Sequence, residues 1–525
     1  MKLSPCLELV IQNNWIVPGL LNKNIFANLI GQLSILLVSL VATKFIFSDL
    51  GPEILGVVYF ASILGVTLSA TLDKGLYSLT VLEVSRNYRK DNIYLTLFIQ
   101  SWSVIILFLF LTLSLIVYLV VPFLVDSWLN IETLDRNETV YLIRFLSVVA
   151  LLNFPISFYS SLIRGTQKMV VNNVVDFSSS LFVQLGIVLI LFRSGSVMEV
   201  SFWMALGALL KLLTYQLLCG RFFSLIALLP KWSKAPVVNN FSFLKDMSVI
   251  SLMSLLLRQF DKLVISKIMM VSDVGFYNFL FIGLQKGTIL TNSVATAIYP
   301  KFCESKEEEK IKDVFNLYDF YHECICVFTV PIFLFAPWFY LEILGFVFNE
   351  ELAEYLFIPL CFLSAGFYFN GTLGIPYRLA LAFGETKLAV RQDYIGALIF
   401  FPLTIILVDT YGLPGASLGW LLYFLLGYVT FVPFFYERVL NRKAREYYWL
   451  VTRILVLAVL VFGSSYHWFV FESSRNPVTL VIAYCFTTLI FGLLGLLLLS
   501  KDSRKTIFLY IKHSLSRYMS NLGAQ

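Results

Sequence analysis

Long apolar stretches, separated by short polar connections, run along almost the whole chain. A transmembrane helix needs roughly 20 mainly apolar residues, and fourteen stretches reach about that length. Their approximate ranges are 25–47, 53–80, 93–122, 139–163, 170–192, 199–220, 247–269, 274–298, 319–345, 353–380, 386–408, 413–435, 448–468 and 477–500. Lipid offers backbone N–H and C=O groups no partners, so spanning segments are helices or strands of a closed barrel. Barrel strands would alternate over about ten residues, whereas these stretches are continuous. The pattern therefore predicts an all-α polytopic membrane protein with about 14 transmembrane helices.

Basic residues are distributed unevenly between alternate connections. One set contains the stretches SRNYRKD, RGTQK, KFCESKEEEKIKD, GETKLAVRQD and ERVLNRKARE. The intervening connections, such as FSDLGPE, FNEELAE and VDTYG, are poor in Lys and Arg. Because Lys and Arg in short loops mark the cytoplasmic side, the first set is predicted to be cytoplasmic. With fourteen spans, the N- and C-termini are then both cytoplasmic.

Composition agrees with this class and argues against several others. Only 14% of the 525 residues are charged and 58% are hydrophobic, whereas soluble domains are about 25% charged. The net charge of +6 is spread over short loops that suit anionic lipid headgroups, so we expect membrane lipids and no nucleic acid as partners. The seven scattered cysteines suggest no disulfide framework. His322, Cys324 and Cys326 lack a second ligand pair nearby, so we expect no metal site and no cofactor.

Two segments about half a chain apart share one pattern. In TKFIFSDLGPEILGVVYFASILG (43–65) and SKIMMVSDVGFYNFLFIGLQKG (266–287), a Lys and an apolar stretch precede Ser-Asp, Xaa-Gly and Tyr. We interpret this as two six-helix lobes in pseudo-repeat plus two C-terminal helices, with chance similarity of apolar segments as the alternative. Duplicated bundles with a midplane cleft are typical of transporters. The predicted divisions are an N-terminal lobe (1–220), a cytoplasmic linker with an amphipathic segment (221–246), a C-terminal lobe (247–436), a helix pair (447–500) and a basic cytoplasmic tail (501–525).

The span 247–269 carries Arg258, Asp261 and Lys262 close to the predicted middle of the membrane. Three such charges facing lipid would cost on the order of 8–10 kcal/mol, but at i, i+3 and i+4 they share one helix face that can turn away from lipid. One interpretation is a structural Arg258–Asp261 ion pair. The other is a cationic, water-filled cleft, in which Asp261 is the candidate for ion coupling. The remaining candidates for a substrate-binding cationic cleft are Lys286, Lys211, Lys44 and Lys74.

Short motifs along the whole chain resemble one known family. They are FDKLVI, VGFYN and YPKF in the seventh and eighth spans, with LGPEILGVVYF, LIRGTQKMVVNNVVD, LAFGETKL and YGLPGASLGWL elsewhere. Together they resemble the polysaccharide biosynthesis (Wzx-type) lipid-linked oligosaccharide flippases, in the superfamily that includes MurJ and the MATE exporters. The resemblance implies alternating-access export of an undecaprenyl-pyrophosphate-linked oligosaccharide, such as an O-antigen (lipopolysaccharide), capsule or exopolysaccharide repeat unit. It also implies the bacterial inner membrane as location, and a glycan polymerase and chain-length machinery as partners.

A cationic cleft fits this function, because Lys and Arg bind phosphate oxygens through charge-assisted hydrogen bonds. We therefore expect a membrane transporter rather than an enzyme. Two alternatives stay open at this point. A MATE-like drug or cation antiporter has the same fold but would favour acidic cleft residues and twelve spans. A membrane-embedded glycan polymerase or glycosyltransferase would need a large extracytoplasmic loop, whereas the longest predicted here has about 16 residues.

Overall fold

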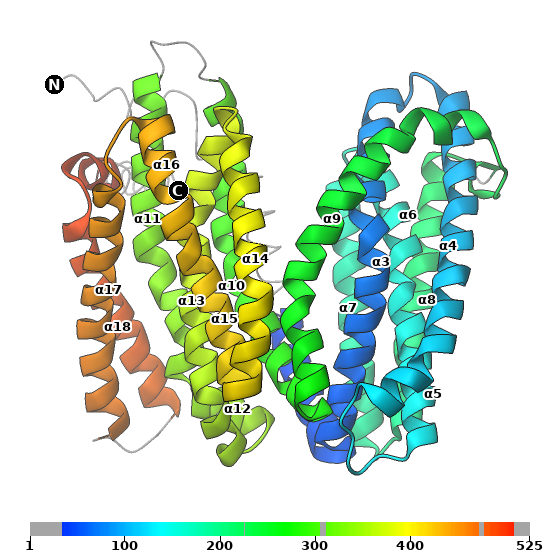
Figure 1. Ribbon diagram of the computed structural model, residues 1–525, viewed down its shortest axis with the longest axis horizontal. Helices are drawn as coiled ribbons and strands as arrows, with labels where there is room; N and C mark the ends of the chain where they lie inside the picture. The colour runs from blue at the N-terminus through cyan, green and yellow to red at the C-terminus, as the bar shows by residue number, and fades with distance from the viewer. Residues whose placement is uncertain (1–33, 225, 305–310, 472–476, 509–525) are drawn as a thin grey trace, which may run out of the picture.

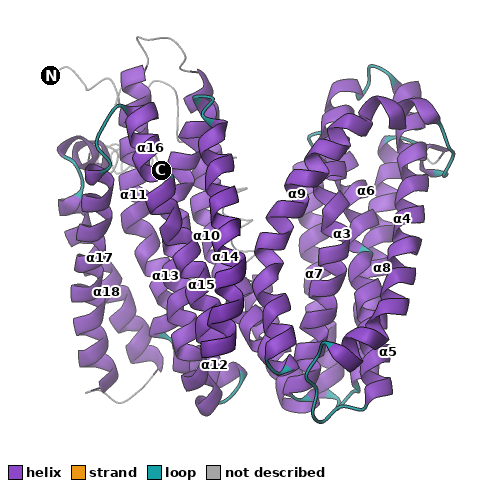
Figure 2. Ribbon diagram, in the orientation of Figure 1, coloured by secondary structure: helices purple, strands orange, loops and turns teal. Residues whose placement is uncertain are grey.

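The computed structural model describes residues 34–224, 226–304, 311–471 and 477–508. In these ranges the chain forms helices joined by short loops, and its β-structure amounts to one isolated bridge between Asn130 and Met270 (Figure 2). The helices form two bundles that stand side by side, with the N-terminal part of the chain on the right of Figure 1. The all-α prediction is thereby confirmed.

The N-terminal bundle is built from residues 34–45, η1 (Ile46–Leu50), α3 (Pro52–Asn87), α4 (Asn92–Ser127), α5 (Arg136–Leu151), α6 (Asn153–Gly165), α7 (Met169–Phe192) and α8 (Val197–Phe222). Then follow η2 (Ile226–Leu228), α9 (Lys234–Ile268), α10 (Val271–Glu304), α11 (Ile311–Trp338), α12 (Tyr340–Val347), α13 (Glu350–Ala382), α14 (Thr386–Tyr411), α15 (Leu413–Thr430), α16 (Val432–Phe435) and η4 (Tyr436–Leu440). The chain continues through α17 (Arg445–Tyr466), η5 (His467–Phe471), α18 (Pro477–Leu498) and a helix over 501–508.

Eleven helices in the described ranges are long and apolar enough to cross a membrane. They cover every predicted span except the first, the seventh and the eighth. Residues 25–33 of the first predicted span lie outside the described residues, and α9 and α10 contain the seventh and eighth. The chain is thus a multi-pass membrane protein, and the count of fourteen spans stays a prediction.

Local sequence sets where several helices begin. The Asp135 carboxylate caps α5 by accepting hydrogen bonds from the backbone N–H groups of Asn137 and Glu138. Ser196 and Glu199 form a reciprocal capping box at the start of α8. Such caps satisfy N–H groups that the first helical turn leaves unpaired. Gly412 joins α14 to α15 with a φ of 63°, a backbone conformation that glycine adopts without steric cost.

The two bundles meet along a seam formed by α3, α9 and α10. α9 packs along α3 of the N-terminal bundle and also touches α10 and α14 of the C-terminal bundle. Because α9 includes residue 247 and contacts both bundles, these contacts do not assign it to one lobe, and the predicted boundary at 247 stays a prediction. Gly56 of α3 and Gly275 of α10 let these helices approach closely at the seam. A Cβ on Gly56 would lie 2.0 Å from the carbonyl oxygen of Val271, and one on Gly275 would lie 3.0 Å from the nitrogen of Gly56. Both glycines belong to the two segments that share the sequence pattern, 43–65 and 266–287, so these segments meet at the seam.

The connection between α4 and α5 reaches across the seam. The Asn130 side-chain amide donates to the carbonyl of Met269 at 3.1 Å, and the backbone carbonyl of Asn130 accepts from the backbone N–H of Val271 at 3.1 Å. The Trp128 indole N–H donates to Ser266 Oγ at 2.9 Å. This contact lies at the end of the bundles that the loop charges predict to be external. At the opposite, predicted cytoplasmic end the bundles diverge (Figure 1).

Glu53 holds the same connection to the N-terminal bundle. Its carboxylate accepts hydrogen bonds from the backbone N–H groups of Glu132, Thr133 and Leu134, at 2.8 to 3.1 Å for the shortest bond of each. The Thr133 hydroxyl adds a fourth bond of 2.6 Å. Charge-assisted bonds of this kind are stronger than neutral ones, so α3 and the α4–α5 connection form one unit against which α9 and α10 are held.

Candidate functional site

Two buried charges of α9 neutralise one another. Lys262 Nζ lies 3.3 Å from Asp261 Oδ1, and their side chains are 2% and 0% exposed. The ammonium also donates to the backbone carbonyl of Arg258 at 2.9 Å and lies 3.6 Å from the centre of the Phe281 ring. The Trp420 indole N–H donates to Asp261 Oδ2 at 2.7 Å. A buried ion pair is tolerated when further hydrogen bonds satisfy its atoms, and these contacts do so. Asp261 therefore pairs with Lys262, its neighbour in the chain, rather than with Arg258.

Arg258 and Lys286 differ from this pair because both side chains are exposed. No hydrogen bond or ion pair to either side chain is formed within the described ranges. Arg258 lies on α9, which packs along α3 and also touches α10 and α14. Lys286 lies on α10, which together with α9 packs against α3 at the seam. Two seam helices thus each carry an uncompensated cation.

Lys211 belongs to a polar cluster inside the N-terminal bundle. Its Nζ lies 2.9 Å from Asp176 Oδ1, and the same carboxylate accepts from the Tyr215 hydroxyl at 2.9 Å. Arg164 contributes a second cation 3.7 Å from Asp176 and donates to the Tyr77 hydroxyl at 3.0 Å. Two cations against one carboxylate leave one positive charge in excess. Sequence reasoning missed Arg164 and Asp176, although both lie in the quoted stretch LIRGTQKMVVNNVVD.

The other predicted cleft lysines lie elsewhere. Lys44 Nζ lies 3.7 Å from the centre of the Phe346 ring on α12, a cation–π contact. Two neighbouring ring contacts, of Phe47 with Phe276 and Phe348, fix the same part of the first predicted span against the C-terminal bundle. The Lys74 side chain lies outside the described residues. Among the described residues, Lys44 therefore contacts Phe346 and makes no direct contact with Arg258 or Lys286.

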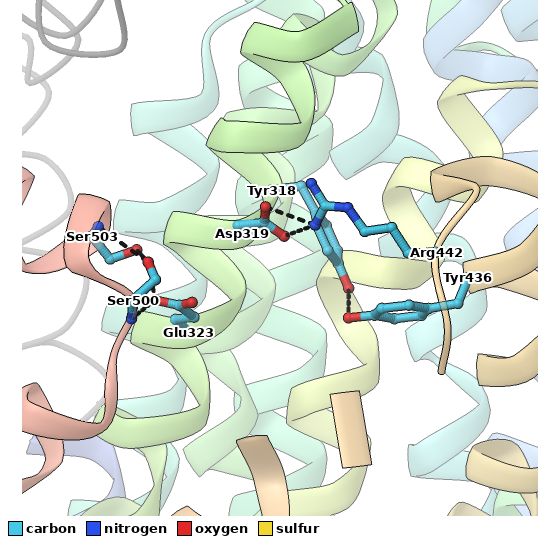
Figure 3. Close-up of polar contacts among 7 residues, drawn as sticks. All are labelled: Tyr318, Asp319, Glu323, Tyr436, Arg442, Ser500 and Ser503. Carbon is cyan, nitrogen blue, oxygen red and sulfur yellow. Dashed lines mark hydrogen bonds and ion pairs between the residues drawn. The ribbon is translucent and has the colours of Figure 1, made fainter. Parts of the chain in front are cut away.

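A second polar region surrounds α11 at the predicted cytoplasmic side (Figure 3). Asp319 forms an ion pair with Arg442 from the η4–α17 connection at 2.8 Å. The Tyr318 hydroxyl donates to that of Tyr436 at 3.4 Å. One turn along α11, Glu323 contacts Ser500 beyond the end of α18. These contacts join α11 to the last two long helices of the chain.

His322, in the stretch HECIC, is part of an aromatic stack. It lies between the rings of Tyr318 and Tyr447, with centroids 5.4 and 4.8 Å away. Cys326 Sγ is 3.7 Å from its Nε2. The described residues contain no group of three or more His, Cys, Asp or Glu side chains that could hold a metal ion. The histidine thus has a packing role in the core of the C-terminal bundle.

The family model for "Polysaccharide biosynthesis protein" matches residues 21–306, more than half of the chain. The chain belongs to this family. The resemblance stated from the sequence motifs is thereby confirmed, and with it a membrane transporter rather than an enzyme. One relative, named "Putative O-antigen transporter" in Shigella flexneri, is 23% identical over 402 residues, which are 76% of this chain and 93% of the relative.

Solved structures with the same fold include two classes of transporter. The lipid II flippase MurJ in an inward closed conformation superposes with a TM-score of 0.66 at 14% identity, over 89% of this chain and 98% of MurJ. An inward-facing multidrug resistance MATE family transporter of the MOP superfamily gives a TM-score of 0.61 at 15% identity, over 78% of this chain and 98% of the other. At these identities the likeness establishes the fold, while function depends on the site.

Proposed function

We propose that the protein is a flippase for an undecaprenyl-pyrophosphate-linked oligosaccharide, of the O-antigen, capsule or exopolysaccharide type. In this proposal it moves the glycan across the bacterial inner membrane by alternating access, with both termini in the cytoplasm. Membership of the polysaccharide biosynthesis family and the O-antigen transporter relative support the class of substrate. The observation that carries the proposal is the pair of exposed cations Arg258 and Lys286 on the seam helices, neither of which has an ion-pair partner among the residues that the structure describes.

The distribution of charge favours an anionic headgroup over a cationic drug. Asp261 and Lys262 cancel one another, so Arg258 and Lys286 leave the seam helices positive. The Lys211 cluster adds one positive charge in the N-terminal bundle. Pyrophosphate oxygens would accept charge-assisted hydrogen bonds from such groups, and a low local dielectric strengthens the attraction. A site for lipophilic cations would need an uncompensated carboxylate instead. Asp261 and Asp176 are both paired, whereas Asp393 on α14 has no ion pair among the described residues.

The arrangement of the bundles supports alternating access. They touch at the predicted external end and diverge at the predicted cytoplasmic end (Figure 1), which is the arrangement in which a substrate enters from inside. Outward movement of a doubly negative headgroup is favoured by an inside-negative potential, by about 2.3 kcal/mol per charge per 100 mV. The empty cationic site moves inward on its return, and the same inside-negative potential favours that direction for positive charge. In our proposal, protonation of Asp261 is the ion-coupled step that accompanies this return.

The experiment is transport by the purified protein in proteoliposomes loaded with a fluorescent polyprenyl-pyrophosphate-linked oligosaccharide. We expect Arg258→Ala combined with Lys286→Ala to abolish translocation while the protein keeps its folded level in the membrane. The matched control, Lys90→Ala with Lys387→Ala, removes two exposed cations outside α3, α9 and α10, one in the α3–α4 connection and one in the first turn of α14, and should transport normally. Undiminished transport by the seam variant would refute the cationic site. Transport of lipophilic cations in place of the glycan lipid would favour the drug antiporter.

A further inference from the structure

The chain continues past α18 into a helix whose start is fixed by α11. Glu323 of α11 accepts hydrogen bonds from the backbone N–H of Ser500 at 3.0 Å and from its hydroxyl at 3.1 Å (Figure 3). Ser500 Oγ in turn accepts from the N–H of Ser503 at 3.2 Å. A carboxylate at a helix N-terminus is stabilised by the helix dipole, so Glu323 both caps this helix and attaches it to the C-terminal bundle.

The two faces of the helix over 501–508 differ in character. Ser503 and Thr506 are 4% and 7% exposed and face the protein. Lys501, Lys505 and Phe508 are exposed and lie at i, i+4 and i+7, on one face, with the exposed Asp502 beside them. Phe508 is 69% exposed. Helices that lie in the membrane interface typically carry such lysine side chains together with exposed aromatic residues.

The position of the helix suits that role. It follows α18 at the end of the molecule where the connections α3–α4 and α8–α9 also lie, the end predicted to be cytoplasmic (Figure 1). Asp319 and Arg442 form their ion pair on the neighbouring turn of α11 (Figure 3). The helix is thus held at the cytoplasmic end of the C-terminal bundle, away from the seam that carries Arg258.

We propose that the exposed face of residues 501–508 binds anionic phospholipid headgroups of the cytoplasmic leaflet, and that Glu323 thereby anchors the C-terminal bundle to this leaflet. Lys501 and Lys505 bind the headgroup phosphates, and the Phe508 ring lies at the level of the first acyl carbons. The bound molecules are bilayer lipids rather than the transported glycan lipid, because this surface is separate from the seam. Each lysine close to an anionic surface contributes about a fivefold gain in affinity, so both together contribute about 25-fold.

A site-specific quenching experiment tests this surface. The seven cysteines are replaced by serine, Asp502→Cys is labelled with a small fluorophore, and the full chain is placed in nanodiscs without glycan lipid. Brominated phosphatidylglycerol and brominated phosphatidylcholine are compared as quenchers at equal, low mole fraction. We expect phosphatidylglycerol to quench several times more strongly, and this preference to decline as salt rises, because salt screens exposed charges.

Two variants and one control decide the outcome. Lys501→Gln with Lys505→Gln should bring the quenching ratio of the two lipids close to one. Glu323→Gln should lower the ratio and increase the mobility of the label, because the helix loses its attachment. Lys90→Gln with Lys387→Gln should leave the ratio unchanged. Equal quenching by both lipids in the parent protein, or an unchanged ratio in the double lysine variant, would overturn the proposal. Neither result bears on glycan transport, which the seam variants test separately.

Discussion

The pair of charges inside α9 allows a quantitative test by a double-mutant cycle. Asp261→Asn removes the negative charge but keeps an oxygen that can accept from the Trp420 indole. Lys262→Met removes the positive charge but keeps the apolar stem that lies against Phe281. Each single change leaves one buried, uncompensated charge, because the two side chains are 0% and 2% exposed. The double variant contains neither charge.

The expected magnitudes follow from that burial. Removal of one partner of a buried pair costs about 3–5 kcal/mol, whereas replacement of both by neutral groups of similar volume is close to neutral. We therefore expect each single variant to lose about 3–5 kcal/mol of unfolding free energy, and the double variant to stay within about 1 kcal/mol of the wild type. Trp420→Phe deletes one hydrogen bond to a charged group, which costs about 1.5–3 kcal/mol, and the smaller ring leaves a cavity among buried aromatic side chains that adds to this loss.

Steric trapping of the unfolded state in bicelles measures these free energies directly. Strictly additive losses, with the double variant the least stable, would show that Asp261 and Lys262 do not compensate one another, and would refute the reasoning. Transport by the folded double variant then separates the two roles predicted for Asp261. A purely structural ion pair leaves export intact, whereas ion coupling through Asp261 requires export to stop.

The remaining predictions concern the seam and the topology. A disulfide between cysteines at 130 and 270, in place of Asn130 and Met270, should arrest transport until it is reduced, because these residues join the two bundles. A disulfide that replaces the Glu53–Thr133 contact lies within one bundle and should leave transport intact. Equal arrest by both would contradict the rocking of separate bundles. Gly56→Ala should lower the free energy of unfolding by roughly 1–3 kcal/mol, as overpacking does, because the added Cβ would lie 2.0 Å from the backbone oxygen of Val271. An increase in stability would show that the seam is looser than described. Reporter fusions in the α4–α5 and α12–α13 connections should report the outside, and fusions in the α8–α9 and η4–α17 connections the cytoplasm. A cytoplasmic signal at α4–α5 would overturn the predicted orientation.

Part of the candidate site was predictable from residue type and spacing. Charges as sparse as Arg258, Asp261 and Lys262 stand out in an apolar span, since each would be costly in lipid. Their spacing predicted one shared face turned away from lipid. Asp261 and Lys262 are buried, whereas Arg258 is exposed. The partner of Asp261 was less predictable. Residues at i and i+1 do not face each other on a helix, so sequence spacing favoured Arg258, whereas the contacts of Lys262 with Phe281 and with the Arg258 carbonyl direct its flexible side chain toward Asp261.

Sequence alone determined the class of this protein. Long apolar stretches must become helices in lipid, because backbone groups have no other partners there, and the motifs along these helices identify the polysaccharide biosynthesis family. Tertiary structure decided which charges are cancelled and which remain. Trp420 is 159 positions from Asp261, and Asp176 is 35 positions from Lys211 by residue number. No local periodicity encodes such pairings, since helix packing brings these residues together across different spans. For the same reason, only the folded chain shows Arg258 and Lys286 as exposed cations on the helices between the two bundles.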